Sequence, residues 1–176
     1  MPELPEVEIT SRRIARAVVG EVVESVLAPG MVTMKTFDPP LDSLVGRTIS
    51  AVSRRGKMPV VEFDGELALL IHLMSAGRLQ VFDKRASLRD KASRLLIRLP
   101  GERELRLREF GTQQRAWAKL LPLDAVDSDD AVATLGPEAL PVPPVEELAE
   151  RVRVPRHLHP LLRDQRVIAG IGRSWV

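Results

Sequence analysis

The chain has 176 residues and a mass of 19.5 kDa, which allows one or two domains. Its apolar fraction of 44% and charged fraction of 28% are typical of a globular protein and argue against wholesale disorder. The absence of cysteine excludes disulfides and thiolate zinc sites within these residues. No apolar run reaches the roughly 18 residues of a membrane span, and the N-terminus lacks the regions of a signal peptide. We therefore expect a cytoplasmic protein without a membrane partner.

The charges fall into three blocks. Residues 84–115 carry ten Lys or Arg against four Asp or Glu, residues 124–150 carry eight acidic residues and no Lys or Arg, and residues 151–173 carry six Arg against one Asp. Two basic blocks around an acidic one suit an anionic polymer held by two modules, with the acidic connector kept away from it. Solvated faces of a soluble protein explain the pattern equally well.

The first predicted element is a helix over residues 6–19, because apolar residues recur there at helical spacing and Pro5 suits the first turn. From residue 21 the apolar pattern changes toward a period of two. Strands are predicted over residues 22–27, 48–52, 60–63, 67–73, 79–82, 94–99 and 104–107. Asp64-Gly65 predicts a hairpin, and Pro100-Gly101 predicts a turn.

The pattern changes again near Leu121. We expect a catalytic β-rich domain over residues 1–121, an acidic, proline-rich linker over 122–144, and a partial helical domain over 145–176. In the last part, residues 144–153 and 157–163 are typical of helices, and the glycine-interrupted segment 167–172 leads toward a further helix.

Pro2 is the first residue that suggests chemistry. Removal of the initiator methionine before this small residue would leave Pro2 with a free secondary amine. Such an amine can attack a carbon that carries a leaving group and form an iminium, or Schiff base. Its pKa lies near that of an α-amino group, so a neutral fraction exists at pH 7. Glu3 lies beside it and can exchange protons. Many proteins begin with Met-Pro without such chemistry.

Three further residues and one glycine-containing segment carry weaker signals. Lys57 follows a predicted strand, where a solvated turn lysine is the ordinary interpretation. Phe110, next to Arg108 and before Gly111, is either core or a loop-borne wedge that unstacks bases. Met74 is more often core than wedge. The Gly170-Ile171-Gly172-Arg173 segment offers backbone amides for a phosphate.

Taken together, these segments resemble the formamidopyrimidine-DNA glycosylase and endonuclease VIII family. Met-Pro-Glu-Leu-Pro-Glu-Val-Glu at residues 1–8 is similar to the N-terminal signature of that family. The other matching segments keep the family's order and spacing. They are Gly56-Lys57, His72 to Gly77, Arg108-Glu109-Phe110-Gly111, Leu135-Gly136-Pro137-Glu138, Asp164-Gln165 and Ala169 to Gly172.

The resemblance implies an α+β fold, with an N-terminal helix on a two-layer antiparallel β-sandwich, followed by a partial helix–two-turn–helix domain that binds DNA. It implies base-excision DNA repair by a bifunctional DNA glycosylase and AP lyase acting on oxidised bases, purines above all. The damaged nucleotide would be flipped into a pocket. The Pro2 amine would attack C1′ and displace the base, and β- then δ-elimination would cut the strand.

The resemblance also implies residue roles. Pro2, Glu3 and Lys57 would be catalytic, with Glu3 moving protons at the sugar and Lys57 contacting the phosphate or base at the lesion. The residues implied to bind DNA are Met74, Ser75, Arg108, Phe110, Gly170, Gly172 and Arg173. Arg108 would face the base left unpaired, and Phe110 would wedge beside it. The partner would be double-stranded DNA with an oxidised base or an abasic site, bound by a monomer.

Several positions depart from the family pattern. Without a gap, Ser75 rather than Met74 stands at the place of the void-filling methionine. Glu109 replaces a basic residue and would bring a negative charge near the DNA backbone. Arg173 replaces an asparagine that contacts phosphate, and arginine binds phosphate with a different geometry. The family's further helices and its four-cysteine zinc finger have no counterpart here, so we expect a truncated second domain, no cofactor in this chain and an activity that truncation can abolish.

Two alternatives remain open at this point. One is an enzyme for oxidised pyrimidines of the endonuclease VIII type. The other is a DNA-binding relative or fragment that keeps the fold without turnover.

Overall fold

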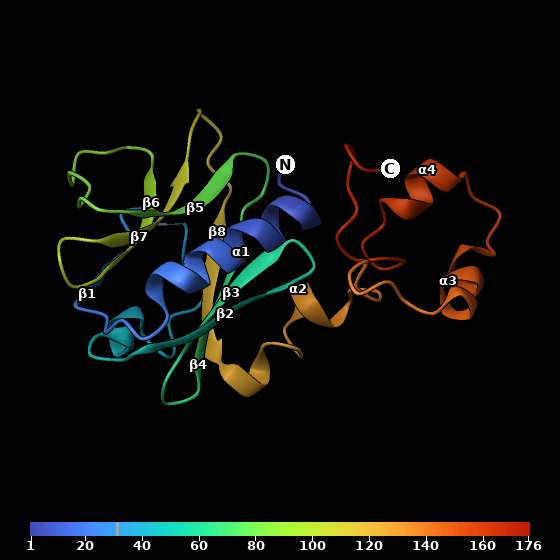
Figure 1. The fold of residues 1–176 in the computed structure, drawn as a ribbon. Helices are drawn as coiled ribbons and strands as arrows, with labels where there is room; N and C mark the ends of the chain where they lie inside the picture. Colours follow the sequence, from blue (N-terminus) through green and yellow to red (C-terminus); the bar gives the residue numbers. More distant parts are fainter. Residues whose placement is uncertain (31) are drawn as a thin grey trace.

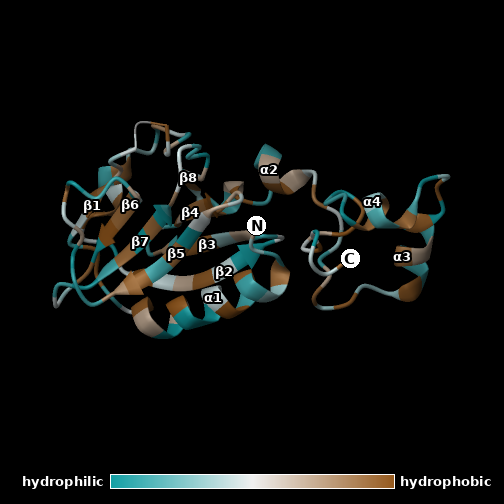
Figure 2. Ribbon diagram, turned by 90° about the horizontal axis from the view of Figure 1, so that it is seen from above, coloured by the Kyte–Doolittle hydropathy of each residue, from teal (hydrophilic) through white to brown (hydrophobic). Residues whose placement is uncertain are grey.

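The structure is a computed structural model that describes residues 1–30 and 32–176. It consists of an N-terminal helix, two four-stranded antiparallel sheets that pack against each other, and a small C-terminal lobe with two helices (Figure 1). The predicted α+β sandwich is confirmed. Figure 2 shows the lobe that contains α3 (Val145–Val152) and α4 (Leu158–Leu162) beside the sandwich, with the N-terminus between the two.

Helix α1 (Leu4–Val18) begins two residues before the predicted start. Pro5 stands in its first turn, where a missing N–H costs nothing, and Glu6 favours the positive end of the helix dipole. Its buried side chains repeat at helical spacing and lie against strands of both sheets; they are Leu4, Val7, Ser11, Ile14 and Val18. The helix therefore joins the two layers and brings its N-terminal end to the C-terminal lobe.

One sheet has the order β1-β6-β7-β5, and the other has the order β2-β3-β4-β8. The strands of the first are β1 (Ser25–Leu27), β6 (Ser93–Arg98), β7 (Glu104–Glu109) and β5 (Gly77–Phe82). The strands of the second are β2 (Ile49–Arg55), β3 (Met58–Phe63), β4 (Leu67–His72) and β8 (Trp117–Pro122). All seven predicted strands form, and β8 adds an eighth at the end of the β-rich region.

The sequence of strand β4 is apolar without alternation because both of its faces are covered. Leu67, Leu69 and Ile71 belong to the core between the sheets. Ala68 and Leu70 point to the opposite face, where Val126 and Val132 cover them in a second apolar cluster. Both faces of the strand are thus buried, so neither needs polar residues.

This second cluster also changes the picture of the linker. The short helices η2 (Leu123–Ala125) and α2 (Asp130–Ala133) lie within the predicted linker 122–144, yet they pack on the sandwich. The segment after α2 continues to the lobe, and Leu135 within it still packs on the second cluster. The predicted helices at 144–153 and 157–163 form as α3 and α4, but the expected helix after residue 172 does not, because residues 173–175 form a turn.

Another short helix, η1 (Leu41–Leu44), precedes β2. Among the residues that the structure describes, no helix is long and apolar enough to cross a membrane.

Candidate active site

A cavity of about 560 Å³ lies where the N-terminus, the β2–β3 turn, the β4–β5 loop and the C-terminal lobe meet. Its polar and charged lining comes from segments far apart in the sequence. The residues that line the cavity include Met1, Lys57, His72, Met74, Ser75, Trp117, Arg163, Gln165, Gly172 and Arg173. The fold therefore brings together five of the predicted site residues, namely Lys57, Met74, Ser75, Gly172 and Arg173.

Glu3 anchors the N-terminal end of the site. Its side chain is almost fully buried, with a residue exposure of 3%. One carboxylate oxygen accepts a hydrogen bond from the amide of Gly172 at 2.7 Å, and the other accepts one from the amide of Ser174 at 2.8 Å. Burial raises the pKa of Glu3, but these amides and the charge of Lys57 outweigh burial, so the pKa lies below its ordinary value. Glu3 is thus a fixed, ionised carboxylate.

The glycines of the C-terminal loop permit this close approach. A Cβ atom at Gly172 would collide with the Glu3 carboxylate, and one at Gly170 would collide with Leu4. The carbonyl of Gly170 accepts the Leu4 amide at 3.0 Å. Gln165 holds the loop in shape, because its side chain accepts from the amide of Gly170 and donates to the carbonyl of Ile171. Gly172 lines the cavity, whereas Gly170 is buried against α1 and does not face it.

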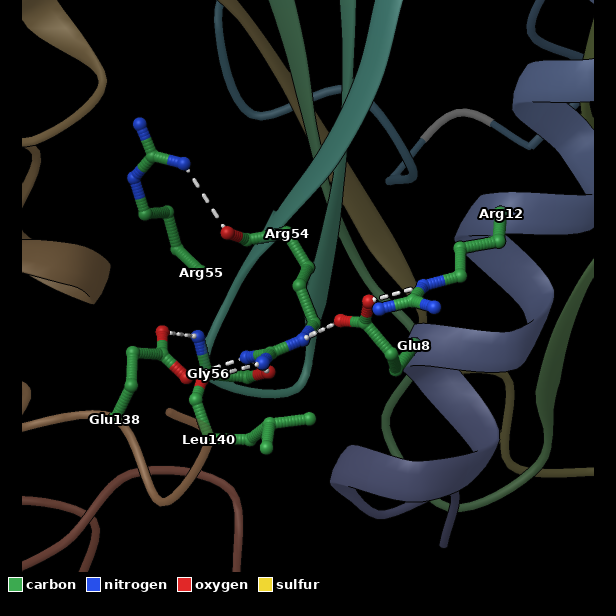
Figure 3. A network of polar contacts seen from close by, with 7 residues as sticks. All are labelled: Glu8, Arg12, Arg54, Arg55, Gly56, Glu138 and Leu140. Carbon is green, nitrogen blue, oxygen red and sulfur yellow. Dashed lines mark hydrogen bonds and ion pairs between the residues drawn. The ribbon is translucent and has the colours of Figure 1, made fainter. Parts of the chain in front are cut away.

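Arg54 fixes the turn that carries Lys57. Figure 3 shows its guanidinium between Glu8 of α1 and Glu138 of the linker. Its Nε lies 2.6 Å from the Glu8 carboxylate, and Nη2 donates to the carbonyl of Leu140 at 3.0 Å. Glu138 also accepts the amide of Gly56 at 2.6 Å. Because Gly56 precedes Lys57, this cluster sets the position of the lysine relative to α1 and the lobe.

The same cluster reaches the glycine loop. Glu138 forms an isolated β-bridge with Ala169, and the amides of Ala139 and Ala169 donate across it. The family-like segment 135–138 therefore connects the β2–β3 turn to the glycine loop in this chain. Burial lowers the pKa of Arg54, but the two carboxylates raise it above its ordinary value, so the guanidinium stays charged.

Lys57 and His72 face the cavity as a pair of perturbed bases. Burial lowers the pKa of Lys57, with Glu3 opposing and Arg163 adding to this effect. Burial, followed by the charge of Lys57, also lowers the pKa of His72. The His72 Nδ1 accepts the Met74 amide at 3.0 Å, which assigns the proton of the neutral ring to Nε2 as a free donor.

Sequence reasoning assigned no role to His72, Arg163 or Gln165. The alternation along β4 was the available signal for His72, because it places this residue on the same face as Ala68 and Leu70, where the cavity lies.

Met74 and Ser75 share the β4–β5 loop at the cavity. Met74 is partly buried and has a φ of 51°, a left-handed conformation that is uncommon outside glycine. Ser75 is exposed. Both line the cavity, so the loop offers a long apolar side chain directly before the position of the family's void filler.

Pro2 lies beside this cavity and lines a neighbouring one of about 340 Å³, together with Glu6, Leu73 and Arg78. Met1 lines both cavities and is 61% exposed. Its removal would uncover the Pro2 amine next to the Glu3 carboxylate.

Arg108 and Phe110 lie elsewhere, at the end of β7, and line none of this cavity. The Phe110 ring is 55% exposed and lies 4.6 Å from the Arg108 guanidinium carbon. Glu109, expected to face the DNA backbone, is instead buried, and its carboxylate accepts the Ala116 amide at 2.9 Å. The strand alternation turns it inward, so it closes the 110–116 loop and brings no charge to the surface.

Within the described residues, no group of three or more His, Cys, Asp or Glu side chains is placed to hold a metal ion.

Residues 1–113 match the family model described as the formamidopyrimidine-DNA glycosylase N-terminal domain. Among curated relatives, the formamidopyrimidine-DNA glycosylase of Latilactobacillus sakei is 29% identical, with 100% of this chain and 63% of the relative covered. That of Roseiflexus sp. is 36% identical, with 99% and 64% covered.

Solved structures give the same match. The Lactococcus lactis protein non-covalently bound to DNA with an AP site has a TM-score of 0.78 at 27% identity, covering 97% of this chain and 65% of that one. Its complex with DNA containing an oxidised pyrimidine has a TM-score of 0.79 at 28% identity, with 97% and 64% covered. The chain thus spans somewhat less than two thirds of the length of these relatives.

Proposed function

The chain belongs to the formamidopyrimidine-DNA glycosylase family, and from this we propose that it is a DNA glycosylase with AP-lyase activity that removes oxidised bases from double-stranded DNA. One observation carries the proposal: Pro2 of the family signature precedes the buried, ionised Glu3 and lines a cavity next to the one that Lys57 lines, with Met1 at both cavities. An amine, a carboxylate and a cation are the groups that displacement of a base from a sugar requires.

In this mechanism the lesion is flipped out of the stack into the cavity. The lone pair of the Pro2 nitrogen forms a bond to C1′, and the bond between C1′ and the base breaks as the base leaves with a proton. Ring opening yields an iminium between Pro2 and C1′. Loss of a proton from C2′ then expels the 3′ phosphate, and a second elimination expels the 5′ phosphate.

In these reaction steps Glu3 acts as a proton acceptor, because its lowered pKa keeps the carboxylate ionised. Its charge also stabilises the positive iminium nearby. Lys57 contacts the phosphate or the base at the lesion, and the free Nε2 proton of His72 offers a second donor from the same wall. Met74 or Ser75 fills the void from the β4–β5 loop, while Gly172 and Arg173 approach the phosphates.

Oxidised purines are the expected substrates, because the curated relatives are named for formamidopyrimidine. The solved complex of a relative with an oxidised pyrimidine supports the second substrate class. The protein would act as a monomer in the cytoplasm. Sedimentation at micromolar concentration checks the monomeric state.

Borohydride trapping on a duplex with one abasic site tests the proposal. Borohydride reduces an iminium to a stable amine, so wild-type protein should give a covalent adduct. A Pro2→Gly variant should give far less. The sharpest control is an N-terminally extended form that retains Met1, because it keeps every side chain and blocks only the nitrogen.

Adduct in the wild type but not in the extended form supports the proposal. Equal trapping in both forms would mean that an amine other than that of Pro2, such as a lysine, is the nucleophile. DNA retardation without any adduct would support a binding relative without turnover. A panel of duplexes with 8-oxoguanine, formamidopyrimidine and thymine glycol then separates the substrate classes.

A further inference from the structure

Phe82, at the end of β5, stands between two arginines of the neighbouring strand β7. The guanidinium carbon of Arg106 lies 3.9 Å from the centre of the Phe82 ring, and that of Arg108 lies 5.5 Å from it. Arg108 in turn lies 4.6 Å from the centre of the Phe110 ring. All three distances are within the range of a cation–π interaction. Arg108 is therefore held by two aromatic rings, one on each of two elements.

The lower part of this stack is rigid. Arg106 is buried, its Nε donates to the carboxylate of Glu104 at 2.7 Å, and its Nη2 donates to the carbonyl of Lys84 at 2.9 Å. Glu104 is fully buried and also accepts from Arg98 and from the amide of Ala86. With every partner of Arg106 fixed, the Phe82 ring has a fixed support on one face.

Arg108, in contrast, has no hydrogen bond and no ion pair to any of the described residues. Its Nε is buried and lacks a partner. Asp90 is near enough for the charge of Arg108 to lower its pKa, but the carboxylate is already engaged by the hydroxyl of Ser93 and the amide of Ala92. The guanidinium is thus oriented by aromatic faces while its donors remain available to a ligand.

We propose that Phe82 is a positioning residue that holds the Arg108 guanidinium toward the base opposite the lesion, where the guanidinium would favour cytosine over adenine. This inference rests on the proposed function, in which flipping the lesion leaves the opposite base unpaired. The Watson–Crick edge of cytosine presents two adjacent acceptors, O2 and N3, which match paired guanidinium donors. Adenine presents an amino donor there, which faces a guanidinium unfavourably.

The test compares Phe82→Leu, which removes the ring, with Phe82→Tyr, which keeps it. Phe37→Leu makes the same change at a phenylalanine that is 80% exposed and has no cation–π contact with the described residues. Single-turnover cleavage is measured on duplexes with an abasic site opposite cytosine or adenine, and on the single strand alone. Affinity for duplexes with an uncleavable abasic analogue, again opposite either base, is measured in parallel.

Phe82→Leu should reduce the cytosine-over-adenine ratio by roughly three- to tenfold, the fold-change that a partly desolvated cation–π contact corresponds to. Phe82→Tyr and Phe37→Leu should keep the wild-type ratio, and the single-strand rate should not change in any variant. Both rates are measured on the same preparation of the variant. Partial misfolding of Phe82→Leu therefore lowers both rates and leaves the cytosine-over-adenine ratio unaffected.

A wild-type preference that survives in Phe82→Leu would overturn the inference, as would a wild type that cleaves or binds both duplexes equally. In either case cleavage itself leaves the proposed function standing. No cleavage of any substrate by the wild type would instead refute the proposed function, while a cytosine preference in binding that Phe82→Leu reduces would still support the role of Phe82.

Discussion

The sandwich and the C-terminal lobe are ordered by different forces. Nearly all the buried apolar side chains belong to residues 1–133, in the core between the sheets and the smaller cluster under α2. After residue 133 the buried apolar side chains are Pro143, Leu161, Ile168 and Ala169, and α3 buries none of its residues. The lobe is attached to the sandwich through Glu3, Arg54 and Glu138 instead. Global stability therefore comes from the sandwich, and assembly of the site depends on a few polar contacts.

The largest expected effect is in the core of the sandwich. Phe63→Ala should lower the free energy of unfolding by about 3–5 kcal/mol, because it removes a fully buried ring and leaves a cavity. Urea denaturation followed by circular dichroism measures this loss. Phe37→Ala, at an exposed ring, is the control and should change the free energy little. Similar losses in both variants would contradict the assignment of stability to the core.

Arg54→Met should have a smaller effect on unfolding and a larger one on the lobe. It removes one donor each from Glu8, Glu138 and the Leu140 carbonyl, at a cost of about 1–3 kcal/mol. Limited proteolysis should cut residues 134–176 faster than in the wild type, while the sandwich fragment persists. Arg13→Met removes an exposed arginine and should leave the pattern unchanged. Unaltered cleavage in Arg54→Met would show that the lobe is held by other contacts.

Acid should release the loop from Glu3. Because the pKa of Glu3 is lowered in the folded state, its contacts stabilise fully above the unfolded pKa, and this stabilisation is lost as the pH falls through the folded pKa. The amide resonances of Gly172 and Ser174 should therefore stay constant from neutral pH to below the ordinary carboxyl range, and shift only in stronger acid. Glu3→Gln should lack this transition. A transition at the ordinary carboxyl pKa would contradict the lowered value.

The smallest effect is expected on α3. Val145 is 76% exposed, so Val145→Glu should change the free energy of unfolding by no more than about 0.5 kcal/mol. Thermal unfolding of the two proteins side by side is sufficient to check this. A clear destabilisation would mean that Val145 makes an apolar contact within the lobe.

The sandwich was largely predictable because its signals are local. Period-two alternation and the Asp64-Gly65 turn give the strands between residues 48 and 82, and the hairpin registers follow from them. The helix in the linker was missed because four residues, 130–133, are too few for a helical period to show. The helix expected after residue 172 is not formed within residues 173–176, where residues 173–175 form a turn.

The site was predictable in composition but not in contacts. The N-terminal signature and the resemblance pointed to Pro2, Glu3 and Lys57, and the structure places them around one corner of the molecule. The role of Gly170 as a spacer against Leu4 and the burial of Glu109 depend on tertiary approach. No pattern along the chain encodes which side chain a glycine must avoid.

The two hydrogen bonds of Glu3 span 169 and 171 positions of the sequence, which orders events during synthesis. The last strand of the sandwich is complete once Pro122 has been added, and ribosomes extend a chain by about 5–20 residues per second, so Ser174 follows roughly 3–10 s later. During that interval the N-terminal part of the chain leaves the ribosome while the partners of Glu3 do not yet exist. A processing aminopeptidase would thus meet Met1 on an open end, and would expose the nitrogen of Pro2, the proposed nucleophile, before the loop that binds Glu3 has been synthesised.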